Sequence, residues 1–148
     1  MTVDPGVGAG RYRGSCACGA VRFTATGPLR PIVACHCRQC RKMSGHFVAA
    51  TEAPEGNLRF GRDDGLRWYE SSAQARRGFC GFCGSTLFFK LHARAHVAIF
   101  AGALDDFDGL RLAGHLHAGD AAPYYEIADG LPLLDRAAID ALAGGPGR

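Results

Sequence analysis

The sequence predicts an all-β domain built from short strands. Glycine accounts for 21 of the 148 residues, and so many glycines favour turns and short strands over a helical bundle. Extended segments recur at spacings typical of an all-β domain, with turn residues between them. Seven cysteines fall into three tight groups, and groups of this kind can tie a fold together through metal ions.

Seven extended segments alternate with turns between residues 21 and 100. The expected strands are residues 21–24, 31–34, 47–50, 58–60, 66–69, 86–91 and 96–100. Gly61, Gly65 and Gly84 mark turns between them. Two helices are expected: a short turn after Cys37, through residues 39–42, and a C-terminal helix over residues 134–143, where apolar residues recur on one face.

The length indicates one domain. We divide the chain into a flexible, glycine-rich leader (1–12), a zinc domain (13–135) and a C-terminal helix and tail (136–148). The first residues lack the basic and apolar regions of a signal peptide, and no segment has the roughly 20 apolar residues that span a bilayer. We therefore expect a cytoplasmic protein without a membrane partner, in which thiols stay reduced and serve as metal ligands.

The charge of the chain is mildly basic, with a net charge of +3 and a pI near 8.6. Nucleic-acid binding calls for a basic tract interleaved with aromatic residues. The sequence offers only short basic clusters, so a nucleic-acid partner is not expected. Nothing in the sequence fixes the oligomeric state.

Four of the cysteines predict a closed, structural zinc site. Cys16 and Cys18 lie two residues apart, and Cys80 and Cys83 have the spacing of a zinc knuckle. Each pair supplies half of a tetrahedron, and Gly84 can take the positive φ that a knuckle requires. Disulfides among these four cysteines are the alternative, and the reducing compartment argues against it.

The remaining cysteines predict a second, open zinc site. Cys35, Cys37 and Cys40 can gather around one ion if Cys40 turns back on a first helical turn. Three protein ligands and one open position are typical of a catalytic zinc. His36 should point away from its neighbours, whereas His46 is an alternative fourth ligand that would close the site.

Three thiolates favour thiol chemistry at that open position. Three thiolates and one Zn²⁺ ion have a formal charge of −1 together, which weakens the zinc ion as a Lewis acid. The ion still stabilises a bound thiolate over the thiol. Arg38, Arg41 and Lys42 lie beside the group, and we expect Arg38 and Arg41 to bind a substrate that carries carboxylates. Simple exposure of these cations to solvent is the alternative.

Other polar residues give weaker indications. Arg13, Arg76 and Arg77 lie near the four-cysteine group in the sequence and could balance its charge, although exposure to solvent is the simpler interpretation for each. His115 and His117 face the same way on an extended segment. Without a third ligand nearby, they are more simply read as core or surface histidines than as a metal pair.

The cysteine motifs, taken together, resemble one protein family. The chain resembles the glutathione-dependent formaldehyde-activating enzymes, a family that includes the centromere protein V domain, over roughly residues 11–135. The segments that carry the resemblance are Gly14-Ser15-Cys16-Ala17-Cys18-Gly19-Ala20, Cys35-His36-Cys37-Arg38-Gln39-Cys40-Arg41-Lys42 and Phe79-Cys80-Gly81-Phe82-Cys83-Gly84-Ser85. Residues 101–105 and 127–132 resemble two later segments of the family.

The resemblance implies a tent-like fold of short antiparallel sheets with two zinc ions. By matching motifs, Cys16, Cys18, Cys80 and Cys83 would hold the structural ion, and Cys35, Cys37 and Cys40 the catalytic one. The implied activity is that of a carbon–sulfur lyase, in which a thiol such as glutathione adds to a small aldehyde such as formaldehyde, or the reverse. Tyr124 and Ala103 depart from the family pattern, which often has Trp and Thr there.

A different class of function remains open on the sequence alone. A non-catalytic module with two zinc ions could bind a protein or a nucleic acid instead of a small molecule. A second zinc that never responds to thiols would favour this alternative over an enzyme.

Overall fold

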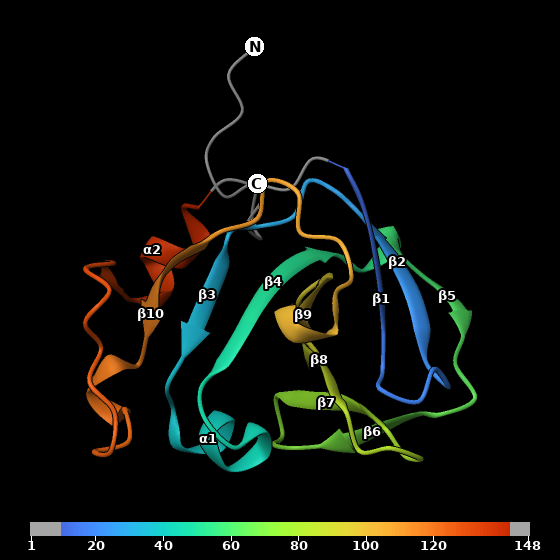
Figure 1. Ribbon diagram of the computed structural model, residues 1–148, viewed down its shortest axis with the longest axis horizontal. Helices are drawn as coiled ribbons and strands as arrows, with labels where there is room; N and C mark the ends of the chain where they lie inside the picture. Colours follow the sequence, from blue (N-terminus) through green and yellow to red (C-terminus); the bar gives the residue numbers. More distant parts are fainter. Residues whose placement is uncertain (1–9, 143–148) are drawn as a thin grey trace.

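The computed structural model describes residues 10–142 and confirms the all-β class (Figure 1). Among these residues, eight strands form one sheet in the order β11-β10-β3-β4-β9-β8-β7-β6, and three form a second in the order β1-β2-β5. The strands are β1 (Arg11–Ser15), β2 (Arg22–Thr26), β3 (Ile32–Cys35), β4 (Val48–Pro54), β5 (Leu58–Arg62), β6 (Leu66–Glu70), β7 (Ala75–Cys80), β8 (Thr86–Leu91), β9 (His96–Phe100), β10 (Leu112–Leu116) and β11 (Leu133–Leu134). The helices are α1 (Arg38–Ser44) and α2 (Arg136–Asp140).

The sheets are antiparallel except at one edge of the larger one. There β10 runs parallel to β3 and β11 parallel to β10. A parallel neighbour requires a crossover connection rather than a hairpin, and the chain between β9 and β10 crosses the top of the molecule in Figure 1 to provide it. The expectation of antiparallel sheets therefore needs correction at this edge.

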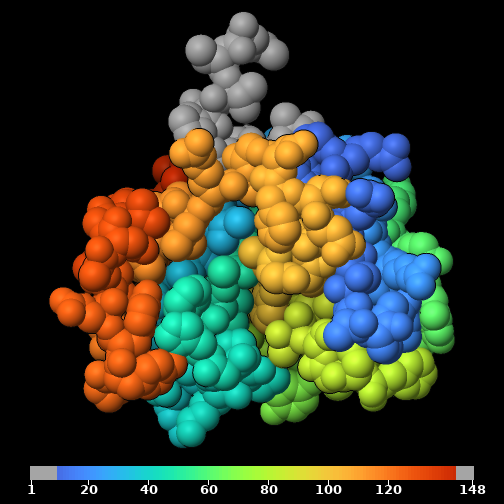
Figure 2. Space-filling view, in the orientation of Figure 1, coloured from blue at the N-terminus to red at the C-terminus, as the bar shows by residue number. Residues whose placement is uncertain are grey.

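The main core lies between the small sheet and one face of the large sheet. Because side chains alternate along a strand, β8 and β9 send Phe88 and Ile99 into this core, where both are fully buried. Phe23 of β2 meets Phe88 edge to face, with ring centroids 5.1 Å apart. The small sheet, whose strands β1 and β2 are blue at the right of Figure 2, is thereby fixed against the large one.

The opposite face of the same strands builds a second, smaller apolar cluster. Phe89 and Ala98, the neighbours of Phe88 and Ile99, pack there with Val48, Ala50 and Phe100. Cys35, Cys37 and Cys40 belong to this cluster. The alternation of β8 and β9 therefore separates the main core from the three-cysteine group.

The expected strands match β2–β6, β8 and β9 to within a few residues. Three differences concern the ends of the chain. First, β1 begins at Arg11, inside the expected leader, because Tyr12 is 1% exposed and its hydroxyl donates to the carbonyl of Asp108 at 2.5 Å. Second, Leu133 and Leu134 pair with β10 instead of starting a helix.

Third, α2 starts only after Asp135, whose side chain caps it by accepting from the Ala138 amide at 2.8 Å. The rest of the expected leader and residues 143–148 lie outside the described residues. Within residues 10–142, no helix has the length and apolar character needed to cross a membrane.

Candidate metal centres

The first site brings Cys16, Cys18, Cys80 and Cys83 together at the junction of the two sheets. Their four sulfur atoms all lie within 4.8 Å of one another. The Sγ atoms of Cys16 and Cys18 are 3.7 Å apart, and those of Cys18 and Cys80 are 3.8 Å apart. Zinc–sulfur bonds of about 2.3 Å in a tetrahedron give sulfur–sulfur distances of about 3.8 Å. The donor set therefore fits a tetrahedral zinc ion.

Local backbone geometry explains how the two pairs converge. Gly84 has φ +79°, as the knuckle requires, and its amide donates to the Cys80 carbonyl at 2.8 Å. Gly65 supports the site by close approach, since an added Cβ would lie 2.9 Å from the Cys80 sulfur. The absence of a side chain at Gly65 therefore leaves space for the Cys80 sulfur.

Ser85 joins the two halves of this site, a contact that the sequence did not reveal. Its hydroxyl accepts from the Ala17 amide at 2.9 Å and lies 3.2 Å from the Cys83 sulfur. The Ser85 hydroxyl and amide lower the pKa of Cys83 to about 5. Burial would raise the pKa of Cys16, but the Val21 amide and the neighbouring sulfurs outweigh it and hold that pKa below its ordinary value. Both shifts favour the thiolate forms that bind metal.

The second site brings Cys35, Cys37 and Cys40 together where β3 passes into α1. Cys35 is the last residue of β3, Cys37 caps α1, and Cys40 lies on the first helical turn. The Cys40 amide donates to the Cys37 sulfur at 3.3 Å. The three sulfur atoms lie within 4.8 Å of one another, and no fourth ligand joins them among residues 10–142. The set thus fits an ion with three protein ligands.

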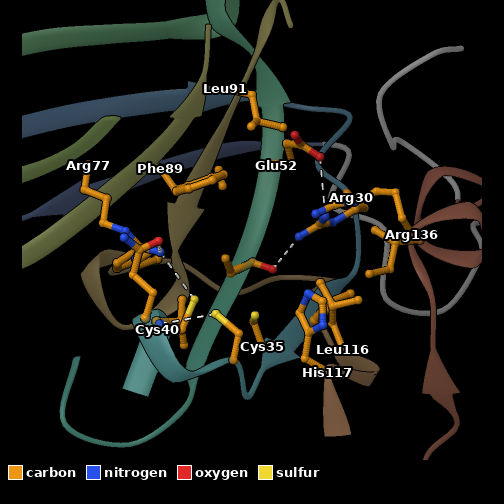
Figure 3. Close-up of a pocket in the computed structure, with 18 residues that line it drawn as sticks. Arg30, Cys35, Cys40, Glu52, Arg77, Phe89, Leu91, Leu116, His117 and Arg136 are labelled. Atoms are coloured by element: carbon orange, nitrogen blue, oxygen red, sulfur yellow. Dashed lines mark hydrogen bonds and ion pairs between the residues drawn. The ribbon is translucent and has the colours of Figure 1, made fainter. Parts of the chain in front are cut away.

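A cavity of about 190 Å³ opens beside these three cysteines. In Figure 3, Arg77 and Phe89 lie on one side, Arg30, Glu52 and Arg136 on the other, and Cys35 and Cys40 below. His117 also lines the cavity, and its φ of +55° is the only positive value of a non-glycine residue in the described chain. Such conformations cluster at functional sites.

Arg77 lies against the three-cysteine group rather than the four-cysteine group. Its Nη2 donates to the Cys40 sulfur at 3.5 Å and to Gln39 Oε1 at 3.4 Å. Hydrogen bonding with the Cys35 thiol, opposed by burial and reinforced by Arg77, lowers the pKa of Cys40 to about 5. The same contact with Cys40 raises the pKa of Cys35. Of these two thiols, Cys40 is therefore the one whose thiolate form is favoured.

Comparison with known proteins agrees with this geometry. The glutathione-dependent formaldehyde-activating enzyme family matches residues 11–120, which include all seven cysteines. The chain belongs to this family. An uncharacterised lyase of Schizosaccharomyces pombe is 35% identical over 81 residues, which span 53% of this chain and 56% of that protein. The chain therefore matches little more than half of the length of this relative.

A solved structure shows the same fold at greater distance. The crystal structure of a Rhodobacter sphaeroides protein superposes with a TM-score of 0.50 and 22% identity, covering 63% of this chain and 87% of that one. At this identity the likeness concerns the fold alone. The β10–α2 edge, with Asp129 and Arg136, lies partly beyond the residues that the family matches.

The structure separates the histidines that the sequence singled out. His36 points away from its cysteine neighbours, as expected, and is 2% exposed. It bonds to His115, so His115 and His117 do not form a metal pair. His46 does not join the three sulfurs, and its Nδ1 lies 2.5 Å from the hydroxyl of Tyr124. Tyr124, a departure from the family pattern, thus contacts the histidine that the sequence offers as an alternative fourth ligand.

The other predicted cations lie elsewhere. Arg13 pairs with Asp106 at 3.0 Å, and Arg76 stacks over Trp68 at 4.1 Å from the ring centroid. Arg38 is exposed, and neither Arg38 nor Arg41 lines the cavity beside the cysteines. A substrate-binding role for these two arginines stays a prediction. The arginines that line the cavity are Arg30 before β3, Arg77 on β7 and Arg136 on α2. They lie far apart in the sequence, so their spacing could not show that they meet.

Proposed function

We propose that this protein is a zinc-dependent enzyme of the carbon–sulfur lyase type, which adds a small thiol to an aldehyde or catalyses the reverse elimination. The observation that carries the proposal is the difference between its two sites. Four sulfurs form the first group, whereas three sulfurs beside a cavity form the second. A closed site suits a structural role, and a site with a free position suits catalysis.

Cys35, Cys37 and Cys40 would hold the catalytic zinc ion, and Cys16, Cys18, Cys80 and Cys83 the structural one. Zinc at the three-cysteine site would supply stabilisation of a thiolate over a thiol at neutral pH. Arg77, in contact with Cys40, offsets the negative charge that three cysteine thiolates bring to the cavity. The apolar side chains of Phe89 and Val48 line the same space and limit the access of water.

The reaction also needs one proton to move. The thiol loses its proton, its sulfur forms a bond to the carbonyl carbon, and the carbonyl oxygen gains a proton. His117 lines the cavity, and an imidazole can accept and donate a proton near neutral pH. We assign this transfer to His117. In the reverse direction His117 takes the hydroxyl proton as the carbon–sulfur bond breaks.

Two comparisons support this class of chemistry. The family is named for activating formaldehyde with glutathione, and the yeast relative is named a lyase. We therefore expect glutathione or a similar thiol and a small aldehyde as reactants, and the cytoplasm, where thiols stay reduced, as the location.

Native mass spectrometry of the full chain across a glutathione titration tests the proposal. We expect two zinc ions per chain, with glutathione adducts on the protein that carries both. Proton NMR of the same protein with glutathione and formaldehyde should show faster exchange between free and adduct forms than in buffer. Full zinc occupancy without adduct or acceleration would contradict an enzyme and favour the non-catalytic module.

A further inference from the structure

Arg77 is a buried cation without a carboxylate partner among residues 10–142. It is 4% exposed, and its guanidinium carbon lies 5.0 Å from the ring centroid of Phe89. Only Nη2 makes hydrogen bonds, to Cys40 and Gln39, whereas Nε and Nη1 are buried without a partner. Buried donors normally find acceptors. Nε and Nη1 have almost no accessible surface, so a ligand can meet Arg77 only through the part of its side chain that lines the cavity, where its positive charge favours an anion.

The other buried arginine of the cavity is already satisfied. Arg30 pairs with Glu52 at 3.3 Å and donates to the carbonyls of Ala50 at 2.8 Å and Pro31 at 3.2 Å. The single carboxylate that lines the cavity, that of Glu52, is thus committed to Arg30. Of the two buried arginines, Arg77 is the one whose charge faces the cavity without a carboxylate.

The size of the cavity limits what can lie beside Arg77. The cavity has a volume of about 190 Å³ and is lined by Arg77 and the three cysteines. A tripeptide thiol could place only its sulfur-bearing end inside. Because Arg77 Nη2 lies 3.5 Å from the Cys40 sulfur, a ligand that reaches both the cysteines and Arg77 is short.

We propose that the cavity accepts glutathione through its sulfur-bearing end but prefers a short thiol whose carboxylate lies one or two carbons from the sulfur, and that Arg77 recognises this carboxylate. The inference rests on the proposed function, which brings the sulfur of the thiol beside Cys35, Cys37 and Cys40. Hydrogen bonds between guanidinium and carboxylate are charge-assisted and stronger than neutral ones. Arg77 thereby acts as a specificity-determining residue.

Isothermal titration calorimetry of the zinc-loaded full chain with four matched probes tests this inference. The probes are 3-mercaptopropionate, its neutral amide 3-mercaptopropionamide, and the same pair without sulfur, propionate and propionamide. The variants are Arg77→Met, which removes the charge, and Arg77→Lys, which keeps it. Arg76→Met is the matched control, because Arg76 is the next residue on β7 and stacks on Trp68 outside the cavity. Zinc content is measured for each variant by mass spectrometry.

The wild type should bind the mercapto acid about tenfold or more tightly than its amide, as a charge-assisted pair predicts. Arg77→Met should bring this ratio to about one, Arg77→Lys should give an intermediate ratio, and Arg76→Met should keep the wild-type ratio. Equal affinity for acid and amide in the wild type would overturn the inference. A ratio that survives in Arg77→Met with two zinc ions bound would do so as well.

The probes without sulfur separate the inference from the proposed function. If propionate binds more tightly than propionamide and this preference needs Arg77, the anion site stands. If the sulfur of 3-mercaptopropionate then adds no affinity, thiol binding at the cysteines is wrong. If Arg77→Met does not fold, the ratios in the wild type and in Arg77→Lys still decide the question.

Discussion

The imidazoles of His36 and His115 share a hydrogen bond, with His36 Nε2 2.8 Å from His115 Nδ1. On its other side, His115 Nε2 lies 2.8 Å from Asp129 Oδ2. A carboxylate only accepts, so His115 donates from Nε2 and accepts from His36 through Nδ1. The Leu131 amide and His115 together hold the pKa of Asp129 below its usual value. His36, which stands between Cys35 and Cys37 in the sequence, is therefore linked through His115 on β10 to the carboxylate of Asp129.

Replacing His115 with Leu should destabilise the protein. The change leaves the Nε2 donor of His36 buried without a partner, which costs about 1–3 kcal/mol. Urea unfolding of the zinc-loaded protein measures the difference in the free energy of unfolding. His92→Ala is the control, because His92 is exposed and should change the stability by less than about 0.5 kcal/mol. A similar small change for His115→Leu would show that the chain of hydrogen bonds contributes nothing.

The two cysteine groups should respond differently to substitution. Cys80→Ser removes a proposed zinc ligand that would link β7 to the loop after β1, so we expect unfolding or aggregation, since structural zinc supplies folding energy. Cys37→Ser should retain the fold and one zinc ion but lose thiol-dependent activity. Circular dichroism and zinc analysis of both variants make the comparison. Equal loss of structure in both would contradict the division into a structural and a catalytic site.

The sequence predicted the two cysteine groups well because their information is local. The spacing of each cysteine pair limits its geometry, and the glycine after Cys83 indicates the required positive φ. The extended segments on β8 and β9 were equally clear, since their apolar residues form uninterrupted short runs. In contrast, β7 (Ala75–Cys80) was missed because Arg76, Arg77 and Gly78 hide its pattern.

The cavity could not be predicted because its groups meet only through the tertiary fold. Arg77 precedes Cys80 by three residues, which suggested the four-cysteine group, yet its side chain leaves the strand toward Cys40. His36 and His115 are 79 positions apart, and only the parallel pairing of β3 and β10 brings them together. Strand neighbours that are distant in sequence leave no local signal.

Replacing His46 with Ala should leave two zinc ions on each chain. His46 bonds to the Tyr124 hydroxyl and does not join the three sulfurs, so its loss removes no ligand. Zinc analysis of the purified variant, beside Tyr124→Phe as a control for the lost hydrogen bond, measures this. One zinc ion per chain in His46→Ala alone would identify His46 as a fourth ligand and close the proposed catalytic site.

Removing one partner of the Arg30–Glu52 pair should be costly. Both side chains are less than a tenth exposed and lie 3.3 Å apart, so Glu52→Gln leaves a buried guanidinium uncompensated. Breaking such a pair costs about 3–5 kcal/mol. The double variant Arg30→Met/Glu52→Leu should recover much of this loss, because no charge then remains buried. Urea unfolding of the wild type, Glu52→Gln and the double variant gives the values, and a double variant no more stable than Glu52→Gln would show that removing the buried charge recovers nothing.

The assignment of proton transfer to His117 predicts a loss of rate without a loss of binding. His117→Gln keeps a polar side chain on the cavity wall but cannot exchange a proton, so the rate of thiol addition should fall by about 10²–10⁴-fold. Calorimetry should show thiol affinity within a few-fold of the wild type, since His117 lies outside the three-cysteine group. Because φ is +55° at this position, His117→Asn is a second variant that suits the backbone and should lose rate equally. His96→Gln is the control for a histidine outside the cavity. An unchanged rate in both His117 variants would remove this residue from the mechanism.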